Sequence, residues 1–82
     1  MEQIARTPKQ IGAALRRRRR AAGFTQAALG AKTELRQATI SALENGEPGT
    51  RLGTLIDVMA ALGLELAIRE RTKAADRIED VF

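Results

Sequence analysis

The chain offers few side chains for catalysis. Its 82 residues include no cysteine and no histidine, and Ser41 is the only serine. A serine nucleophile needs a neighbouring base, and general acid–base chemistry most often uses histidine, so the usual catalytic groups are missing. The acidic residues are scattered without a marked pair, which leaves only carboxylate or lysine chemistry open. We therefore expect no enzymatic activity, no cofactor and no metal site.

Hydrogen-bonding side chains gather instead between residues 36 and 45. On a helical wheel, Ile40 and Leu43 fall close together, which marks the side that faces the core. The opposite side is small and polar, and it consists of Ala38, Ser41, Ala42 and Asn45, with Gln37 at its margin. Arg36 stands at the start of this surface.

A helix with such an outer surface suits the major groove of double-stranded DNA. Small residues permit close approach, and amide or guanidinium groups read the edges of bases. The only aromatic residues are Phe24 and Phe82, which disfavours a stacking platform for single-stranded nucleic acid. The alternative is an ordinary surface helix with small outward residues. We favour DNA reading.

Two short helices and a tight turn would position this surface. Thr25 can cap the first helix by accepting hydrogen bonds from free N–H groups of its first turn. Residues 33–35 interrupt that helix. Asn45 and Gly46 end the second one, because both tolerate a left-handed backbone. Two helices joined in this way form a helix-turn-helix unit.

A basic helix precedes this unit. Thr7 and Pro8 predict its start, and Gly23 predicts that it ends just before. Its five consecutive arginines, residues 16–20, cover the whole circumference, so some must lay their methylene stems along the protein. We expect from them a mixture of DNA phosphate contacts and solvated, ion-paired charges; anionic lipid or RNA is the alternative target. Phe24 is expected in the core.

Charge divides the chain into two unequal parts. Residues 1–40 contain nine basic and two acidic side chains, whereas residues 41–82 contain five basic and eight acidic ones. The formal net charge is +4. A basic part beside a mildly acidic part predicts one face for a polyanion and another for a different contact.

The pattern changes from helical to extended toward the C-terminus. Thr50 can cap a helix over residues 51–62, where apolar residues recur at three and four positions. Beyond it, alternation places Leu64, Leu66 and Ile68 on one side, which predicts a strand. A lone strand has two unpaired edges, so we expect it to pair with the same strand of a second copy in a twofold dimer. Two recognition helices would then read two half-sites.

The expected organisation is one small domain. We predict a flexible N-terminus over residues 1–6, a folded domain over residues 7–70 and a flexible tail over residues 71–82. The apolar end of the tail, Val81 and Phe82, suggests an alternative role as an anchor for a partner. Neither a signal peptide nor an apolar run of about 18 residues is present, so we expect a cytoplasmic protein without membrane association.

The sequence over residues 7–62 resembles the XRE (Cro/C1-type) helix-turn-helix family. The resemblance is carried by residues 25–46, TQAALGAKTELRQATISALENG, and by the basic helix that precedes them. Residues 36–41 (RQATIS) and 59–66 (MAALGLEL) are similar to HipB-type antitoxins. This resemblance implies an all-α helix-turn-helix bundle of four to five helices, with a C-terminal β-strand that pairs across a homodimer.

The resemblance also implies which residues contact DNA. The matching positions are Thr25, Gln26, Arg36, Gln37, Ala38, Thr39, Ser41 and Asn45. Among them, Gln26 matches a phosphate-binding glutamine at a helix start, and Asn45 matches a phosphate contact after the recognition helix. Arg19 and Glu44 match a pair that forms a partly buried salt bridge, and Leu64, Leu66 and Ile68 match the strand of the dimer.

Three residues depart from the family pattern. Glu34 stands where the turn commonly has glycine, and a left-handed conformation there would cost about 1 kcal/mol. Thr33 replaces an apolar residue of the turn, and Arg18 occupies a usually apolar place. These departures concern the packing of the turn.

The function implied by the resemblance is that of a sequence-specific transcriptional repressor. It would act as the antitoxin of a HipA-like serine/threonine kinase toxin and autoregulate its operon. The expected partners are double-stranded operator DNA, a second copy of the chain and that kinase. Two alternatives stay open: a solitary XRE-family repressor without a toxin, and a protein inhibitor whose DNA binding is incidental.

Overall fold

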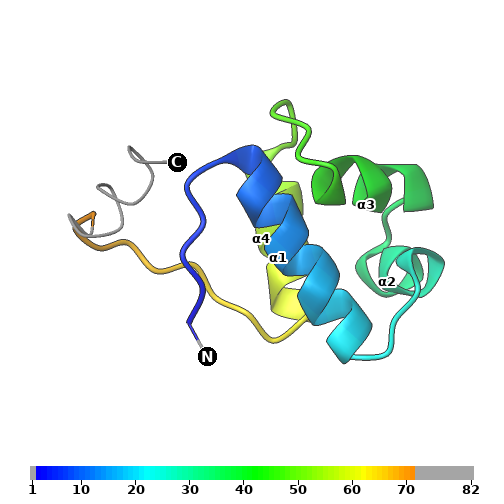
Figure 1. Ribbon diagram of the computed structural model, residues 1–82. Coiled ribbons are helices and arrows are strands. Elements are labelled where there is room, and N and C mark those ends of the chain that lie inside the picture. The colour runs from blue at the N-terminus through cyan, green and yellow to red at the C-terminus, as the bar shows by residue number, and fades with distance from the viewer. Residues whose placement is uncertain (1, 72–82) are drawn as a thin grey trace.

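The computed structural model describes residues 2–71, which form four helices (Figure 1). Their bounds are Pro8–Ala21 for α1, Gln26–Thr33 for α2, Gln37–Glu44 for α3 and Leu52–Ala61 for α4. These bounds confirm the expected helical bundle with its helix-turn-helix unit. The described residues contain no β-strand, since the segment after α4 is extended but not paired with another segment.

Local capping explains where the first two helices begin. The Thr7 hydroxyl accepts a hydrogen bond of 3.0 Å from the Gln10 N–H, and Pro8 takes the first helical position. The Thr25 hydroxyl accepts a bond of the same length from the Ala28 N–H. Both predicted caps are confirmed, because each depends only on neighbouring residues.

Two predicted helix ends differ from the structure. Thr50 does not cap α4, because its hydroxyl donates to the Glu47 carbonyl within the preceding turn, at 3.0 Å. Arg51 takes the cap position without a side-chain hydrogen bond. At the end of α3, Asn45 keeps a right-handed backbone, and Gly46 alone adopts the left-handed one, with φ +83°.

One core joins all four helices. Its buried members are Leu15 of α1, Leu29 of α2, Ile40 and Leu43 of α3 and Val58 of α4. Phe24 is half-buried and packs against this cluster, as expected, and the Lys32 ammonium lies 5.1 Å from the centre of its ring. The cluster fixes which side of α3 faces inward.

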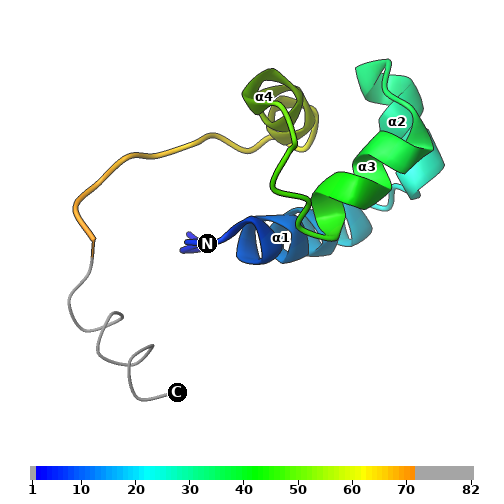
Figure 2. The ribbon, with the colours of Figure 1, turned by 90° about the horizontal axis from the view of Figure 1, so that it is seen from above.

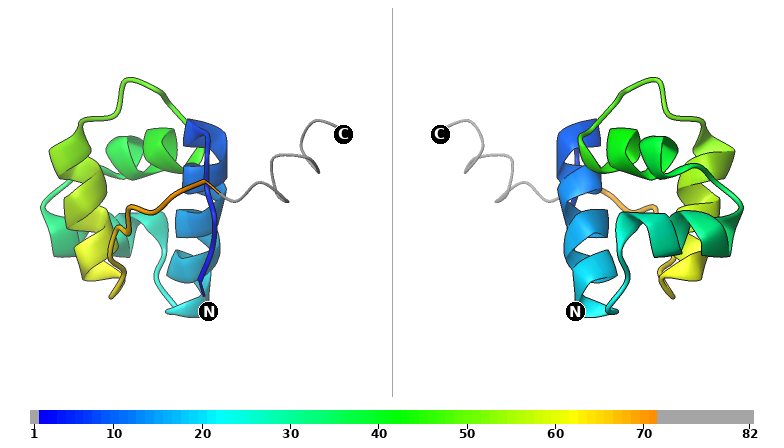
Figure 3. Two further views of the ribbon diagram at one scale, coloured as in Figure 1. Left: turned by 90° about the vertical axis from the view of Figure 1, so that its left-hand side faces the viewer. Right: turned by 90° about the vertical axis from the view of Figure 1, so that its right-hand side faces the viewer.

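The helices α2 and α3 lie on one side of the molecule, and both ends of the described chain lie on the other (Figure 2). The two side views of Figure 3 show this separation: α2 and α3 face the viewer in one view, and the extended terminal segments do so in the other. Helix α1 approaches α3 closely at Gly12, where an added Cβ would lie 2.5 Å from the carbonyl oxygens of Leu43 and Glu44.

The two ends of the described chain come together on the side away from α3. Residues 2–6 are extended, and Glu2 forms an ion pair with Arg69. Of the predicted tail, residues 71–82, all but Arg71 lie outside the described residues. Within residues 2–71, no helix has the length and apolar character needed to cross a bilayer.

Candidate nucleic-acid interface

The turn between α2 and α3 is tight. Glu34 adopts the left-handed conformation expected for it, with φ 60°. Gly30 lets the chain fold back closely, since a Cβ there would lie 2.6 Å from the Leu35 carbonyl oxygen, and the Leu35 N–H donates to the Gly30 carbonyl at 2.8 Å. The Thr33 hydroxyl donates to the Leu29 carbonyl at 2.8 Å, which satisfies it inside α2.

Helix α3 turns its polar side outward. Ile40 is fully buried behind it and Leu43 is 5% exposed. Gln37 is exposed and Ser41, one turn later, is half-buried. Asn45 follows after another turn and is exposed, so the three polar side chains form one line along the helix.

The other residues of this helix that are predicted to contact DNA lie beside these three polar side chains. Ala38 is exposed and has no side chain beyond its methyl group, which permits close approach of a ligand. Thr39 is half-buried at the flank. Arg36 is exposed at the N-cap, where its side chain makes no capping bond and can extend outward.

A buried ion pair fixes the end of α3 to α1. Arg19 donates from Nε to Glu44 Oε2 at 2.6 Å and from Nη2 to Oε1 at 3.0 Å. Its Nη1 donates to the Phe24 carbonyl at 2.8 Å. Both residues are buried, with 7% and 6% exposure, which confirms the salt bridge that the resemblance implied. This bidentate pairing also fixes the orientation of α1 relative to α3.

Gln26 joins the same carboxylate from the start of α2. Its Nε2 donates to Glu44 Oε1 at 3.2 Å. Burial alone would raise the pKa of Glu44, but the hydrogen bonds from Arg19 and Gln26, with the charges of Arg19 and Arg16, hold this pKa below its usual value. The carboxylate therefore stays ionised and keeps the amide of Gln26 oriented.

The start of α2 thus lies beside the end of α3. Thr25 is exposed, and Gln26 is half-buried because of its bond to Glu44. The first turn of a helix presents unpaired N–H groups and the positive end of the helix dipole. The start of α2 and the end of α3 are therefore adjacent through Glu44, and their role in DNA contact stays a prediction.

The side chains of the five consecutive arginines, residues 16–20, lie on different sides of α1. Arg19 is buried, Arg17 donates to the Gln3 side chain at 3.4 Å, and Arg18 lines a groove under the terminal segments. Arg16 lies one turn after Gly12 on the side of α1 that faces α3, and it is exposed. Arg16 is therefore the member best placed beside the α3 surface.

The division of the sequence into a basic and an acidic part did not identify one basic residue near α3. Arg51 belongs to the C-terminal part of the chain, where acidic residues dominate. In the structure it lines the same shallow groove beside α3 as Arg36, together with Thr39, Thr50, Thr54 and the acidic Glu47. The two arginines are 15 residues apart in the sequence, so no local pattern signals that they line one groove.

The predicted strand residues lie elsewhere. Leu64, Leu66 and Ile68 belong to the extended segment on the side away from α3, and they share no surface with the eight DNA-contact positions. The structure therefore separates the two predicted sites, one on each side of the bundle.

Comparison with known proteins agrees with this geometry. Residues 10–72 match the family described as a helix-turn-helix domain. The chain is 32% identical over 69 residues to the antitoxin HipB of Escherichia coli strain K12, which covers 84% of this chain and 78% of that protein. A solved HipB–O4 20mer complex matches with a TM-score of 0.80 and 31% identity, over 87% of this chain and all of that one. A solved HipA–HipB–O2–O3 complex matches with the same values.

Proposed function

Because the chain belongs to the XRE-type helix-turn-helix family and is similar to HipB antitoxins, we propose that it is a sequence-specific DNA-binding repressor. The observation that carries this proposal is the orientation of α3, which is anchored by Ile40 and Leu43 and turns Gln37 and Ser41 outward. The two solved HipB complexes whose chains this one resembles are named for an O4 20mer and for O2 and O3, which supports an oligonucleotide duplex as the ligand.

The side chains of α3 have the chemistry for base reading. Gln37 offers a donor and an acceptor that can pair with adenine, and Arg36 can address guanine or a phosphate. Ala38 and Ser41 leave space for the helix to enter the major groove. Gln26 and Asn45 would hold phosphates at the margins, as their family positions imply.

We further propose that the protein is the antitoxin of a HipA-like kinase and represses its own operon. The similarity to HipB over 84% of the chain and the match to the chain of a HipA–HipB complex support this partner. A solitary repressor is the alternative. Co-purification of the protein with the product of the neighbouring gene distinguishes the two, since only an antitoxin carries a kinase-like protein with it.

The proposed assembly is a homodimer paired through residues 64–70. This segment is extended and lies away from α3, so dimerisation would leave the proposed DNA-binding surface uncovered. Sedimentation equilibrium without DNA measures the oligomeric state. A chain that stays monomeric would contradict the proposed dimer but not the proposal that α3 binds DNA.

DNA binding is tested with the promoter region upstream of the gene. Gln37→Ala should lose about 1–3 kcal/mol of binding free energy on the operator and discriminate less at the base it reads. Gln3→Ala is the matched control, because Gln3 lies on the far side of the bundle and should leave affinity unchanged. Competition with random duplex measures specificity. Equal affinity of Gln37→Ala and the unmodified protein for the operator would contradict the proposal.

A further inference from the structure

The shallow groove beside α3 carries two arginines from different parts of the chain. Arg36 directly precedes α3 and Arg51 directly precedes α4, and both side chains are exposed. Thr50 and Thr54 line the groove together with them. Arg51 is not among the residues that the wheel of α3 or the family resemblance assigns to DNA, so its role is open.

Neither arginine stabilises the free chain. Each takes the N-cap position of its helix without a side-chain hydrogen bond. A positive charge there lies at the positive end of the helix dipole, where an acidic or hydroxyl side chain is preferred. Within residues 2–71, no ion pair joins either guanidinium to a carboxylate. Two unpaired and unfavourably placed charges that line one groove indicate an anionic ligand.

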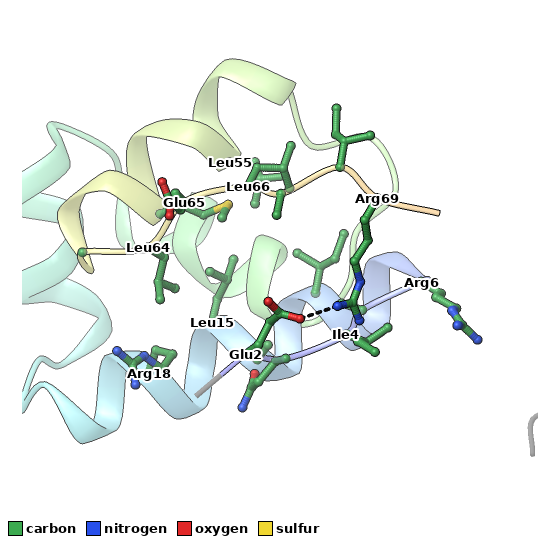
Figure 4. Close-up of a pocket in the computed structure, with 18 of the residues that line it drawn as sticks. Glu2, Ile4, Arg6, Leu15, Arg18, Leu55, Leu64, Glu65, Leu66 and Arg69 are labelled. Carbon is green, nitrogen blue, oxygen red and sulfur yellow. Dashed lines mark hydrogen bonds and ion pairs between the residues drawn. The ribbon is translucent and has the colours of Figure 1, made fainter. Parts of the chain in front are cut away.

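The groove under the terminal segments shows the opposite arrangement (Figure 4). Leu15 of α1 contributes to its apolar floor, and Arg69 reaches across it to form an ion pair with Glu2. That guanidinium already has its counter-charge, whereas those of Arg36 and Arg51 do not. The groove beside α3 is therefore the better site for a polyanion.

This groove lies on the side of α3 that is opposite the start of α2. Around the helix axis, at about 100° for each residue, Glu44 comes before the line of polar side chains and Ala42 comes after it. Glu44 accepts the hydrogen bond from Gln26 of α2, and Ala42 lines the groove with Arg51. A helix that enters the major groove has one DNA strand on each of its two sides. The start of α2 and Arg51 are thus placed for different strands.

We propose that Arg51 holds a backbone phosphate of the operator, on the strand across the major groove from the phosphate at the start of α2. The inference rests on the proposed DNA binding and adds a contact to it. A guanidinium offers paired N–H donors that match two phosphate oxygens. Because phosphates carry no sequence information, this contact adds affinity for any duplex and does not discriminate between operators.

An acidic side chain in the same groove gives the proposal a prediction of opposite sign. Glu47 lines the groove, and its Oε1 accepts a hydrogen bond of 3.3 Å from the Gly49 N–H within the turn. Its charge repels a phosphate held by Arg51. Glu47→Gln keeps the acceptor oxygen and removes the charge, so it should strengthen binding to every duplex about twofold.

Salt titrations of DNA binding by the full chain test the contact. Arg51→Ala should weaken binding to the promoter duplex and to a random duplex alike, by about five- to tenfold per bound protomer at about 0.1 M salt. The slope of log affinity against log salt should fall by about 1 per protomer. Arg51→Lys should retain this slope, because an ammonium group also neutralises a phosphate. Arg17→Ala is the matched control, since it removes the same charge where Arg17 contacts Gln3, and it should leave the slope unchanged.

Thermal unfolding separates DNA contact from a structural role. Arg51→Asp places a capping carboxylate at the start of α4, so its unfolding midpoint should equal or exceed that of the unmodified protein. Its affinity for DNA should nevertheless fall further than that of Arg51→Ala, because the charge is reversed. A lower midpoint in both variants, together with the loss of binding, would assign Arg51 to folding and overturn the proposal.

Three results of the DNA titrations would also overturn it. They are equal salt slopes for Arg51→Ala and Arg17→Ala, a loss for Arg51→Ala that is confined to the promoter duplex, and weaker binding by Glu47→Gln. The proposed function has its own test, because Gln37→Ala should change the discrimination between duplexes and Arg51→Ala should not. Loss of discrimination in Gln37→Ala with an unaffected Arg51→Ala would therefore refute only this contact.

Discussion

The side-chain amide of Gln26 at the start of α2 donates a hydrogen bond of 3.2 Å to the carboxylate of Glu44 at the end of α3. Arg19 of α1 holds the same carboxylate, so one buried charge connects three helices. The proposed phosphate-binding start of α2 and the proposed base-reading side of α3 are thereby fixed relative to each other. Stability of the fold and geometry of the surface depend on the same group.

Neutralising that carboxylate should destabilise the domain strongly. Glu44→Gln leaves the Arg19 guanidinium buried without its counter-charge, which should lower the free energy of unfolding by about 3–5 kcal/mol. Urea unfolding followed by circular dichroism measures it. Glu47→Gln is the matched control, because Glu47 is exposed and should change stability by less than about 0.5 kcal/mol. Equal unfolding midpoints for Glu44→Gln and Glu47→Gln would show that the buried pair is not stabilising.

The same group predicts how stability depends on pH. The pKa of Glu44 is lower in the folded chain than in the unfolded one, so the unfolded state binds its proton first as the pH falls. Its contribution is complete above the unfolded pKa of about 4.3 and is lost as the pH falls through the folded value. Unfolding free energies from neutral pH to about pH 2 should therefore decline less steeply for Glu44→Gln than for the unmodified protein. Parallel curves would contradict this linkage.

Close approach of α1 and α3 predicts opposite effects for two glycine substitutions. Gly12→Ala places a methyl group 2.5 Å from two backbone carbonyl oxygens, so the helices must separate, at about 1–3 kcal/mol. Gly53→Ala in α4 meets nothing within 4 Å and should stabilise the helix by about 0.5–1 kcal/mol. Thermal unfolding of both variants checks the signs. A Gly12→Ala variant as stable as Gly53→Ala would mean that the helices do not pack this closely.

The directions of the arginines predict which of them contacts phosphate. Arg16→Ala should weaken binding to operator and random DNA alike and reduce the slope of log affinity against log salt by about 1. Arg17→Ala should leave this slope unchanged, since Arg17 contacts Gln3 on the other side of α1. Titrations between about 0.05 and 0.3 M salt give both slopes. Identical slopes for the two variants would contradict the prediction that Arg16 contacts phosphate and Arg17 does not.

Much of the fold could be predicted from the sequence because its signals are local. The caps at Thr7 and Thr25 lie within three residues of the groups they bind, and both are confirmed. The wheel of α3 separates its core side from its polar side, because burial of Ile40 and Leu43 leaves the helix only one orientation. Glu34 takes its left-handed conformation because the turn requires it there, whichever residue the sequence supplies.

The errors and omissions arise where a residue has more than one partner available. Thr50 has a capping hydroxyl, but that hydroxyl donates to the Glu47 carbonyl instead. Arg51 and Arg36 line one groove only in the folded chain, which charge counts along the sequence do not show. The strand predicted at residues 64–69 is extended here, and its pairing stays a prediction, since its expected partner is another molecule.

The depth of the Arg19–Glu44 pair has a practical consequence for handling the protein. Ions in solution screen exposed charges over about 10 Å at 0.1 M, but they reach a buried pair far less. Concentrated salt should therefore detach the chain from an immobilised duplex while its tertiary structure stays intact. A heparin or DNA column would release a folded protein, ready for binding again after dialysis.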